Sequence, residues 1–329
     1  MIIKEKDNIL DSINANKISS ILIIGKGYIT FDALTLISKN NIKLISFDYF
    51  GRLNYILESP DRRNVKLKKY QYQLSENSKG IRIAKELIKS KMLNQKSTLT
   101  TLNKRKKIDE INVLKNKITK EIKEIDSLKL TNNHENIKMK IMGCEGKASY
   151  EYWSGIKLLI PPNIGFEQRI QKPTDLLNSM LNYGYAILAS EITKSILLNG
   201  LDPYCGFLHF DRDNRTSLTY DLIEDFRQQI VDKTVINLIN KKQITVTDLD
   251  KRNNSIKLDK RKVIVSKIMD KINSTINYNG EELTYKDIMN KQTSNLVKTI
   301  LDEEEFRGFS LHWWVQVDKI QSKKFCPKI

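Results

Sequence analysis

The sequence predicts an α+β protein with two domains, a small β-rich N-terminal domain followed by a larger all-α domain. Two domains are indicated by the length of 329 residues, which exceeds what one hydrophobic core usually serves. Short apolar, β-branched runs separated by Gly and Asn fill the first part of the chain. From about residue 66 the composition shifts to Lys, Glu, Leu and Ile with few helix breakers. We expect the β-rich domain at 1–72, a linker or first helix at 73–90, and the helical domain at 91–329.

The N-terminal strands are expected at residues 21–24, 28–29 and 43–47, where apolar runs are punctuated by glycine and asparagine. A short helix is expected over 31–39, between two of these strands. The segment IGKGYI contains a Gly-x-Gly pair, which without a third glycine is weak evidence for a phosphate-binding loop. A turn between strands is the better interpretation.

The helices of the second domain are bounded by proline, glycine and capping residues. Pro161 and Pro162 end one helix, Asp175 opens the next, and Gly200 closes it. Ser217 is the expected N-cap of a further helix. We therefore expect helices within 74–126, from about 145 to 160, from 174 to 199, from 217 to 239, and across 257–306 with a break at 277–280.

The charge balance indicates an acidic partner. The chain has 56 Lys and Arg against 39 Asp and Glu, a formal charge of +17. Nucleic acid is slightly favoured over an anionic membrane or an acidic protein, although a Lys-, Ile- and Asn-rich composition also arises in low-GC genomes. No run approaches the roughly 20 apolar residues of a membrane span, and the N-terminus lacks a signal peptide. The three cysteines show no CxxC spacing, so we expect a reduced, cytoplasmic protein.

Two carboxylates are candidates for a functional site on the helix expected after Ser217. Asp221 and Glu224 are three residues apart, so they share a side of that helix, away from the apolar face. The residues alone leave two interpretations open, a solvated surface pair and a paired acidic site.

A histidine and a further glutamate could complete such a site. His209, one of three histidines, precedes the acidic helix, and a neutral imidazole beside carboxylates suits Mn²⁺ at least as well as Mg²⁺. The alternative is a loop histidine hydrogen-bonded to backbone. Glu145 lies near the expected start of a helix, flanked by Gly143 and Gly146, which leave room for a ligand.

The cysteines offer a different chemistry. Cys144 and Cys205 each lie close in sequence to a candidate ligand, so a Cys–His nucleophile or a zinc site is conceivable. No cysteine pair has zinc-ligand spacing. Small buried thiols are the better interpretation.

Four ordered blocks carry a resemblance to a known family. The blocks are EGKASYEYW (145–153), RIQKPTDLLNSMLNYGY (169–185), GLDPYCGFLH (200–209) and SLTYDLIEDFRQQIVD (217–232). Their EG-small, R-x-x-x-P-x-D, GLDP-x-x-GFLH and SL-x-x-DL-x-E-x-FR motifs resemble those of the CRISPR adaptation integrases, the Cas-one family. Lys147 and Glu151 depart from the usual pattern, but neither replaces a ligand. The late helix at 292–301 and the pair Trp313-Trp314 also fit the family.

This resemblance implies a metal-dependent DNA endonuclease and integrase, which inserts spacer DNA into a CRISPR repeat array by transesterification from a 3′ hydroxyl. It implies that Glu145, His209 and Glu224 bind Mn²⁺ or Mg²⁺, with Asp221 as a supporting catalytic carboxylate. It also implies double-stranded DNA as substrate, a homodimer formed through the β-rich domain, and a small partner protein, Cas-two.

Basic residues within or beside the four blocks are candidates for phosphate contacts. For Arg227 an ion pair with Asp225 or Asp232 is an equally good interpretation. Tyr183 and Tyr185 could line the DNA path or belong to the core. The candidates for DNA binding are Arg169, Lys172, Arg212, Arg215 and Arg227.

Three alternative functions compete with this one. A casposon-type transposase shares this catalytic domain but usually carries an extra DNA-binding domain, for which the segment after Trp314 is short. A non-catalytic DNA-binding scaffold of the same fold would have lost the metal ligands. A Cys–His enzyme would depend on Cys205 and not on Glu224.

Overall fold

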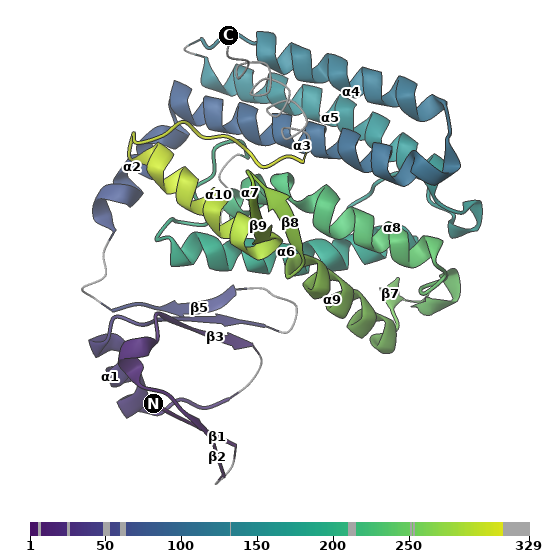
Figure 1. Cartoon of the computed structure of the whole chain (residues 1–329). Helices are drawn as coiled ribbons and strands as arrows, with labels where there is room; N and C mark the ends of the chain where they lie inside the picture. The colour runs from purple at the N-terminus through teal and green to yellow at the C-terminus, as the bar shows by residue number, and fades with distance from the viewer. Residues whose placement is uncertain are drawn as a thin grey trace, which may run out of the picture.

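The computed structural model describes residues 1–5, 8–24, 27–48, 53–59, 64–131, 133–209, 215–250, 252 and 254–311. A small strand-rich part at the N-terminus is followed by a larger helical part, and the two lie at opposite ends of the molecule (Figure 1). The predicted fold class is therefore confirmed.

The N-terminal part contains a hairpin and a three-stranded sheet. Strands β1 (Ile2–Glu5) and β2 (Asn8–Ser12) pair antiparallel. In the sheet, β4 (Lys43–Phe47) lies between β3 (Ser20–Ile24), to which it is parallel, and β5 (Leu53–Leu57), to which it is antiparallel. All five residues of β4 are buried, the polar Lys43 and Ser46 as well as the three apolar residues between and beside them.

Helix α1 (Phe31–Lys39) makes the crossover between the two parallel strands, as the sequence predicts. Its N-cap Thr30 accepts a hydrogen bond from the Ala33 amide. The expected strand at 28–29 is wrong, because these residues form an exposed approach to the cap of α1. Of the Gly-x-Gly segment, Gly25 lies outside the described residues.

Two helices cover the boundary between the predicted domains. Helix α2 spans Val65–Ser75 and α3 spans Ser78–Lys106, so residue 72 lies inside a helix and 73–90 is mostly helical. The limits at 72 and 90 stay a prediction for the domains themselves. The strand-rich part contacts the helical part through β4, where Lys43 Nζ donates to the carbonyl of Leu197 at 2.5 Å. Ile45 and Phe47 pack against Leu197 at the same place.

Helices α3, α4 (Glu110–Ser127) and α5 (His134–Leu159) lie side by side in one layer (Figure 1). Ile111, Leu114, Ile118, Ile122 and Ile125 form the buried stripe of α4, at the three- and four-residue spacing of an amphipathic helix.

Helix α5 differs from the prediction at its start. Its N-cap Asn133 accepts from the Asn136 amide, so the helix begins at His134 and Glu145 lies in its middle. The sequence prediction that Glu145 lies near a helix start is therefore wrong. The end at Leu159, before Pro161 and Pro162, is as predicted. A 3-10 turn, Pro162–Ile164, follows.

Helix α6 (Leu176–Leu198) crosses beneath this layer and is buried along most of its length. Asp175 caps it by accepting from the Asn178 amide, and Gly200 follows its end with φ +78°. Asp175 and Gly200 therefore bound the helix as the sequence predicts.

The helix expected from 217 to 239 is divided into four pieces. These are α7 (Ser217–Leu222), the 3-10 turn η3 (Ile223–Asp225), the π-helical turn η4 (Gln228–Asp232) and α8 (Lys233–Asn240). The N-cap of α7 is Thr216 and not Ser217. Short 3-10 and π turns inside a helix often mark functional positions, and this interruption carries Glu224.

The remaining chain is helical with two small hairpins, so the second domain is mainly rather than purely α-helical. The break expected at 277–280 is the turn of the second hairpin, with positive φ at Asn279 and Gly280. Within the part of the chain that the structure describes, no helix is long and apolar enough to cross a membrane. The remaining elements are η1 (Ala15–Lys17), η5 (Val246–Asp248), β6 (Leu249–Asp250), β7 (Ser255–Ile256), α9 (Leu258–Ile272), β8 (Thr275–Tyr278), β9 (Glu281–Thr284) and α10 (Tyr285–Ile300).

Candidate metal and DNA site

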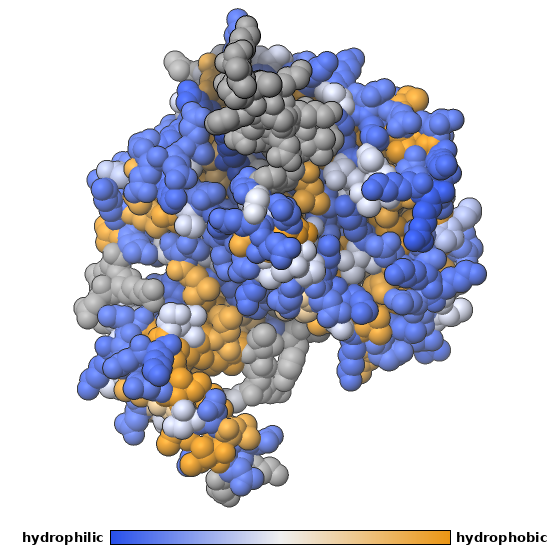
Figure 2. All heavy atoms as spheres, in the orientation of Figure 1, coloured by the Kyte–Doolittle hydropathy of each residue, from blue (hydrophilic) through white to orange (hydrophobic). Residues whose placement is uncertain are grey.

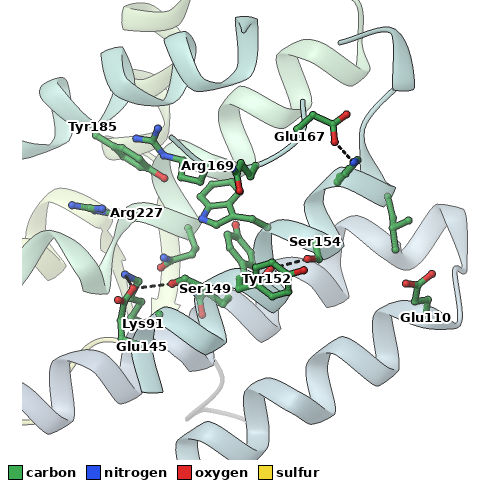
Figure 3. A pocket seen from close by; sticks show the side chains of 18 residues that line it. Lys91, Glu110, Glu145, Ser149, Tyr152, Ser154, Glu167, Arg169, Tyr185 and Arg227 are labelled. Carbon is green, nitrogen blue, oxygen red and sulfur yellow. Dashed lines mark hydrogen bonds and ion pairs between the residues drawn. The ribbon is translucent and has the colours of Figure 1, made fainter. Parts of the chain in front are cut away.

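Two of the predicted metal ligands converge on one point in space. Glu145 comes from α5 and Glu224 from η3, and the ammonium group of Lys91 in α3 lies between them. Lys91 Nζ is 2.5 Å from Glu145 Oε1 and 2.8 Å from Glu224 Oε2. Figure 3 shows the Lys91–Glu145 pair at one end of a cavity. The carboxylates of two distant segments therefore share one cation.

Both glutamates are held in the charged form. Burial alone would raise the pKa of Glu145, but the Lys91 ammonium outweighs burial and lowers it. Burial likewise opposes ionisation of Glu224, whose pKa is lowered by Arg227 and Lys91. The site therefore presents two carboxylate charges at neutral pH. Burial lowers the pKa of Lys91, but the two glutamates outweigh burial and raise it.

His209 is fixed by Asp221, which is fully buried. Asp221 Oδ1 lies 2.6 Å from His209 Nδ1, and the same carboxylate accepts the amides of Phe207 at 2.5 Å and Leu208 at 3.0 Å. A carboxylate only accepts, so Nδ1 donates, and in the neutral imidazole Nε2 is then the nitrogen that has a lone pair. Asp221 thus sets the tautomer that a metal ligand needs, a supporting role of the kind the resemblance implies.

Gly206 makes this loop possible. A Cβ at Gly206 would lie 2.8 Å from Asp221 Oδ2 and 2.9 Å from Ser217 Cβ. The loop therefore wraps tightly around the Asp221 carboxylate only because residue 206 has no side chain.

The donor set fits a divalent cation. Two carboxylates and one imidazole nitrogen form a mixed oxygen and nitrogen set suited to Mn²⁺ or Mg²⁺, and the carboxylates already meet at a cation. Among the described residues, no three His, Cys, Asp or Glu side chains gather at metal-binding spacing. In this arrangement Lys91 takes the position between the glutamates, so a metal held by both would replace its ammonium group as their partner.

A cavity of about 830 Å³ opens beside Glu145 (Figure 3). Lys91, Glu145 and Ser149 line one side, and the Ser149 hydroxyl donates to Glu145 Oε1 at 2.8 Å. Aromatic side chains, including Trp153, cover part of the wall. The cavity therefore reaches Glu145 and its partner Lys91, and its wall suits a polar, ring-containing ligand.

Arg169 and Arg227 line the other side of the cavity and flank the ring of Tyr185. Their guanidinium carbons lie 5.5 Å and 4.8 Å from its centroid. Arg227 pairs with Glu224 at 3.3 Å, so the ion pair suggested with Asp225 or Asp232 is wrong. Arg169 is held by the side-chain oxygens of Asn178 and Asn182, at 2.9 and 2.5 Å. Two of the predicted DNA contacts therefore share one wall near the glutamates.

Of the other predicted basic residues, Lys172 and Arg215 do not line this wall. Lys172 is exposed, and Arg215 lies over the Tyr220 ring at 4.9 Å. Arg212 lies outside the described residues. Tyr183 packs against the core, whereas Tyr185 both lines the cavity and donates to Asp232 at 2.6 Å.

The cysteines at 144 and 205 are buried thiols, as predicted. Burial raises the pKa of the Cys144 thiol, which disfavours a reactive thiolate. The Cys205 thiol donates to the Gln71 carbonyl at 3.9 Å, while His209 Nδ1 is engaged by Asp221. A Cys–His nucleophile gains no support from this geometry.

Lys91 and Asn94 are functional candidates that the sequence patterns do not single out. Both lie on the buried stripe of α3, among Leu87, Ile88 and Leu99. A charged residue at a core-facing helical position is a signal that could have found Lys91, because such a charge needs a buried partner.

Comparisons with known proteins place the chain. The family model described as "CRISPR associated protein Cas1" matches residues 1–270. A Cas1 protein of Methanobrevibacter ruminantium is 57% identical over 316 residues, covering 95% of both chains. A CRISPR-associated endonuclease Cas1 of Archaeoglobus fulgidus is 39% identical over 266 residues, covering 77% of each.

Solved structures have the same fold. A casposase bound to an integration product is similar with a TM-score of 0.73 and 28% identity, covering 90% of this chain and 86% of that one. The chain in a partial Cas6-RT-Cas1–Cas2 complex gives a TM-score of 0.72 at 21% identity, covering 94% and 93%. A Cas1 protein from Thermotoga maritima gives 0.68 at 21% identity, covering 89% and 92%. With its family model and its relatives in agreement, this chain belongs to the Cas1 family of CRISPR-associated proteins.

Proposed function

We propose that this chain is a metal-dependent DNA endonuclease and integrase of CRISPR adaptation, joining the 3′ hydroxyl of a spacer fragment to a phosphodiester of the repeat. The observation that carries the proposal is the convergence of ionised Glu145 and Glu224 on one cation position. The fixed tautomer of His209 supports it. So do the names of the relatives, one an endonuclease and another a casposase bound to an integration product.

The residues proposed to hold Mn²⁺ or Mg²⁺ are Glu145, Glu224 and the Nε2 atom of His209. When bound, the cation would stabilise charge on the phosphoryl oxygens and lower the pKa of the attacking hydroxyl. Asp221 holds the imidazole in its donor tautomer, and Ser149 orients one oxygen of Glu145. Because no covalent protein nucleophile is needed, the buried thiols have no part in this reaction.

Arg169 and Arg227 are proposed to hold DNA phosphates in the cavity beside the glutamates. Guanidinium groups bind phosphate oxygens in pairs of hydrogen bonds, and Asn178 and Asn182 fix Arg169. Aromatic walls suit the stacking of unpaired bases. The net charge of +17 would hold the flanking duplex without reading its sequence, and Lys172, Arg212 and Arg215 stay candidates for that role.

The proposed assembly is a homodimer that also binds a small partner. The strand-rich part exposes large apolar side chains, among them Ile3, Leu10, Tyr28 and Phe31 (Figure 2). Such a concentration on a small surface marks an interface, which supports the predicted dimerisation role of this part. A Cas2-like partner is proposed because one structural neighbour is the Cas1 chain of a Cas1–Cas2 complex.

The test is strand transfer of a labelled short duplex into a supercoiled plasmid bearing a repeat. Wild type and His209→Ala are compared with Mn²⁺, Mg²⁺ or EDTA, with and without the small partner. We expect joined product that requires metal and is lost in His209→Ala, while DNA binding survives. Equal product from both proteins would remove His209 from the mechanism.

A casposon-type transposase is the second candidate, favoured by the 28% identical casposase neighbour. Insertion into a plasmid without a repeat, at the same rate as into the repeat plasmid, would favour it. A scaffold role predicts tight DNA binding with no product under any metal. A Cys–His enzyme predicts activity that survives Glu224→Gln and is lost in Cys205→Ser.

A further inference from the structure

The segment that carries Glu224 has little stability of its own. It is a single 3-10 turn, Ile223–Asp225, between α7 and a π-helical turn. Short 3-10 turns have poor hydrogen-bond geometry, whereas a metal ligand must be held within a fraction of an ångström. The position of the Glu224 carboxylate must therefore be set by neighbouring elements.

Asn94 of α3 is one such neighbour and is fully buried. Its side-chain amide donates to the carbonyl of Asp225, the residue after Glu224, at 2.8 Å. The same amide donates to the carbonyl of Phe309 at 2.8 Å, and its oxygen accepts from the Leu311 amide at 3.1 Å. One side chain thus joins the turn to residues 306–311, here called the C-terminal strap.

The strap and Ser90 of α3 hold the same turn at further points. The Phe309 amide donates to Asp225 Oδ2 at 2.9 Å, and the Ser90 hydroxyl donates to Asp225 Oδ1. The Phe226 and Phe309 rings stack at 5.1 Å with an interplanar angle of 11°. At Gly308 a Cβ would lie 2.4 Å from Ser90 Oγ and 3.0 Å from Asp225 Oδ1. The strap therefore fits the turn without space for one methyl group.

Helix α3 meets this turn at Glu224 and at the residue after it. Lys91 contacts the Glu224 carboxylate, and Asn94, one helical turn further on, holds the backbone carbonyl of Asp225. Holding Asp225 restrains the short turn and, with it, the direction of the Glu224 side chain.

We propose that Asn94 and the C-terminal strap are a positioning unit for the Glu224 carboxylate. This inference rests on the proposed function, in that Glu224 binds the divalent cation. Asn94 and the strap touch neither metal nor DNA in this role; they act through the backbone and carboxylate of Asp225.

The test measures Mn²⁺ affinity from the electron paramagnetic resonance signal of free Mn²⁺, without DNA. We expect Asn94→Ala to weaken binding by about 10- to 100-fold, as for other supporting residues of metal sites. The matched control is Asn103→Ala on the same helix, because Asn103 also makes two backbone hydrogen bonds, to the Ile108 carbonyl and amide. The control should bind Mn²⁺ within about twofold of wild type.

Hydrogen exchange of the metal-free protein gives a second readout. Asn94→Ala should speed exchange in the peptide that covers 223–226, and Asn103→Ala should not. If wild type binds no Mn²⁺, the proposed metal site fails, yet faster exchange in Asn94→Ala alone would still support the positioning of the turn. Unchanged exchange and unchanged affinity in a folded Asn94→Ala protein would overturn the inference.

Gly308→Ala provides a variant that leaves Asn94 in place if Asn94→Ala does not fold. Its added methyl group should weaken Mn²⁺ binding, whereas Gly27→Ala, where a Cβ meets nothing within 4 Å, should not. The effects of Gly308→Ala and Asn94→Ala should be less than additive, because both disturb one contact. Normal affinity in Gly308→Ala would count against the strap.

Discussion

At the scale of single residues, the chemistry of the site depends on how buried charges are compensated. Lys91 balances Glu145 and Glu224, while Tyr152 and Tyr185 donate to the carboxylate of Asp232, at 2.8 and 2.6 Å. These two arrangements have opposite effects. The ammonium lowers the pKa of both glutamates, whereas burial raises the pKa of Asp232 to about 6 despite the two hydroxyl groups.

Replacing Lys91 should make the protein dependent on metal for stability. Lys91→Met removes the counter-ion that Glu145 and Glu224 share and leaves only Arg227 paired with Glu224. This should lower the free energy of unfolding of the metal-free protein by about 3 kcal/mol. Mn²⁺ should then raise the melting temperature more than in wild type, because it no longer competes with an ammonium group. Differential scanning fluorimetry with EDTA and with Mn²⁺ measures both effects. The control is Lys89→Met, which breaks a surface pair with Asp126; an equal response of both variants would contradict the prediction.

Asp232 should impose a pH dependence on stability. Its pKa is about 6 in the folded protein and near 3.8 when unfolded, so between these values the folded state binds more protons. Stability should therefore fall as the pH rises from 4 to 6, by about 3 kcal/mol in all. The measurement is urea unfolding of wild type and Asp232→Asn from pH 4 to 7. The stability of the variant relative to wild type should rise across that window, and a constant difference would be evidence against a buried, neutral Asp232.

At the scale of elements, helix α2 holds the loop that leads to His209. The fully buried Gln71 donates to the carbonyls of Asp202 and Cys205, at 2.8 and 2.9 Å, and accepts from the Asp202 amide at 2.9 Å. The Gln71 amide thus satisfies three backbone groups of the loop, as a neighbouring strand would do in a sheet. The first helix after the strand-rich part therefore holds the loop before one proposed ligand, His209, and α3 contacts the two others.

Removing this amide should loosen the loop. Gln71→Leu keeps the volume but leaves three backbone groups unpaired, so we expect a loss of about 2–4 kcal/mol in stability and faster hydrogen exchange in 201–209. Tyr72→Phe removes only the exposed bond to Asp202 and should cost about 1 kcal/mol or less. Exchange in the loop that is equal in the two variants would show that Gln71 has no special role.

How far the sequence predicts the fold depends on whether the signals are local. The limits of α6 follow from Asp175 and Gly200, and the end of α5 follows from its prolines. The division of the helix expected over 217–239 could not be predicted, because its interruption is held by Asn94 and the strap, far away in the chain. The β8–β9 hairpin has a local signal in Asn279-Gly280, from which only a break between helices was predicted.

The candidate site shows the same division. The motif residues Glu145, His209, Asp221 and Glu224 can be found from the sequence, because their blocks lie in order along it. Lys91 has only a general signal, a charge on the apolar face of a helix, because its two partners appear only when α3 packs between α5 and η3. The placement of Glu145 at a helix start was wrong because the helix is capped by Asn133. It therefore begins at His134, eleven residues before Glu145.

At the scale of the whole molecule, the two parts have different surfaces. The strand-rich part exposes apolar side chains (Figure 2), and the helical part carries the cavity with its arginines (Figure 3). Association of copies and binding of DNA should therefore be separable by mutation.

Phe31→Glu should convert the proposed dimer to a monomer. Phe31 is 87% exposed on α1, so the change should leave the melting of the helical part almost unaltered. Light scattering after size-exclusion chromatography measures the mass. Val113→Glu, at a 56% exposed apolar position of α4, is the control that should remain dimeric. A dimer in both variants would place the interface elsewhere.

DNA binding should be steeply dependent on salt. If the basic surface neutralises several phosphates, the affinity should fall by about 10³-fold or more between roughly 50 and 200 mM salt. Arg169→Gln should reduce the slope of log affinity against log salt by about one. Fluorescence anisotropy over a salt series measures the slope, and an affinity independent of salt would exclude phosphate contacts as its main source.

The glycines around the site differ in what they tolerate. A Cβ added at Gly143 or Gly146, on either side of Glu145 in the sequence, would meet nothing within 4 Å, whereas one added at Gly206 would press on Asp221. In a library of variants selected for spacer acquisition, alanine should survive at the first two positions and disappear at the third. The two glycine positions beside Glu145 can therefore vary during evolution, whereas position 206, before His209, is restricted to glycine because it has no room for a Cβ atom.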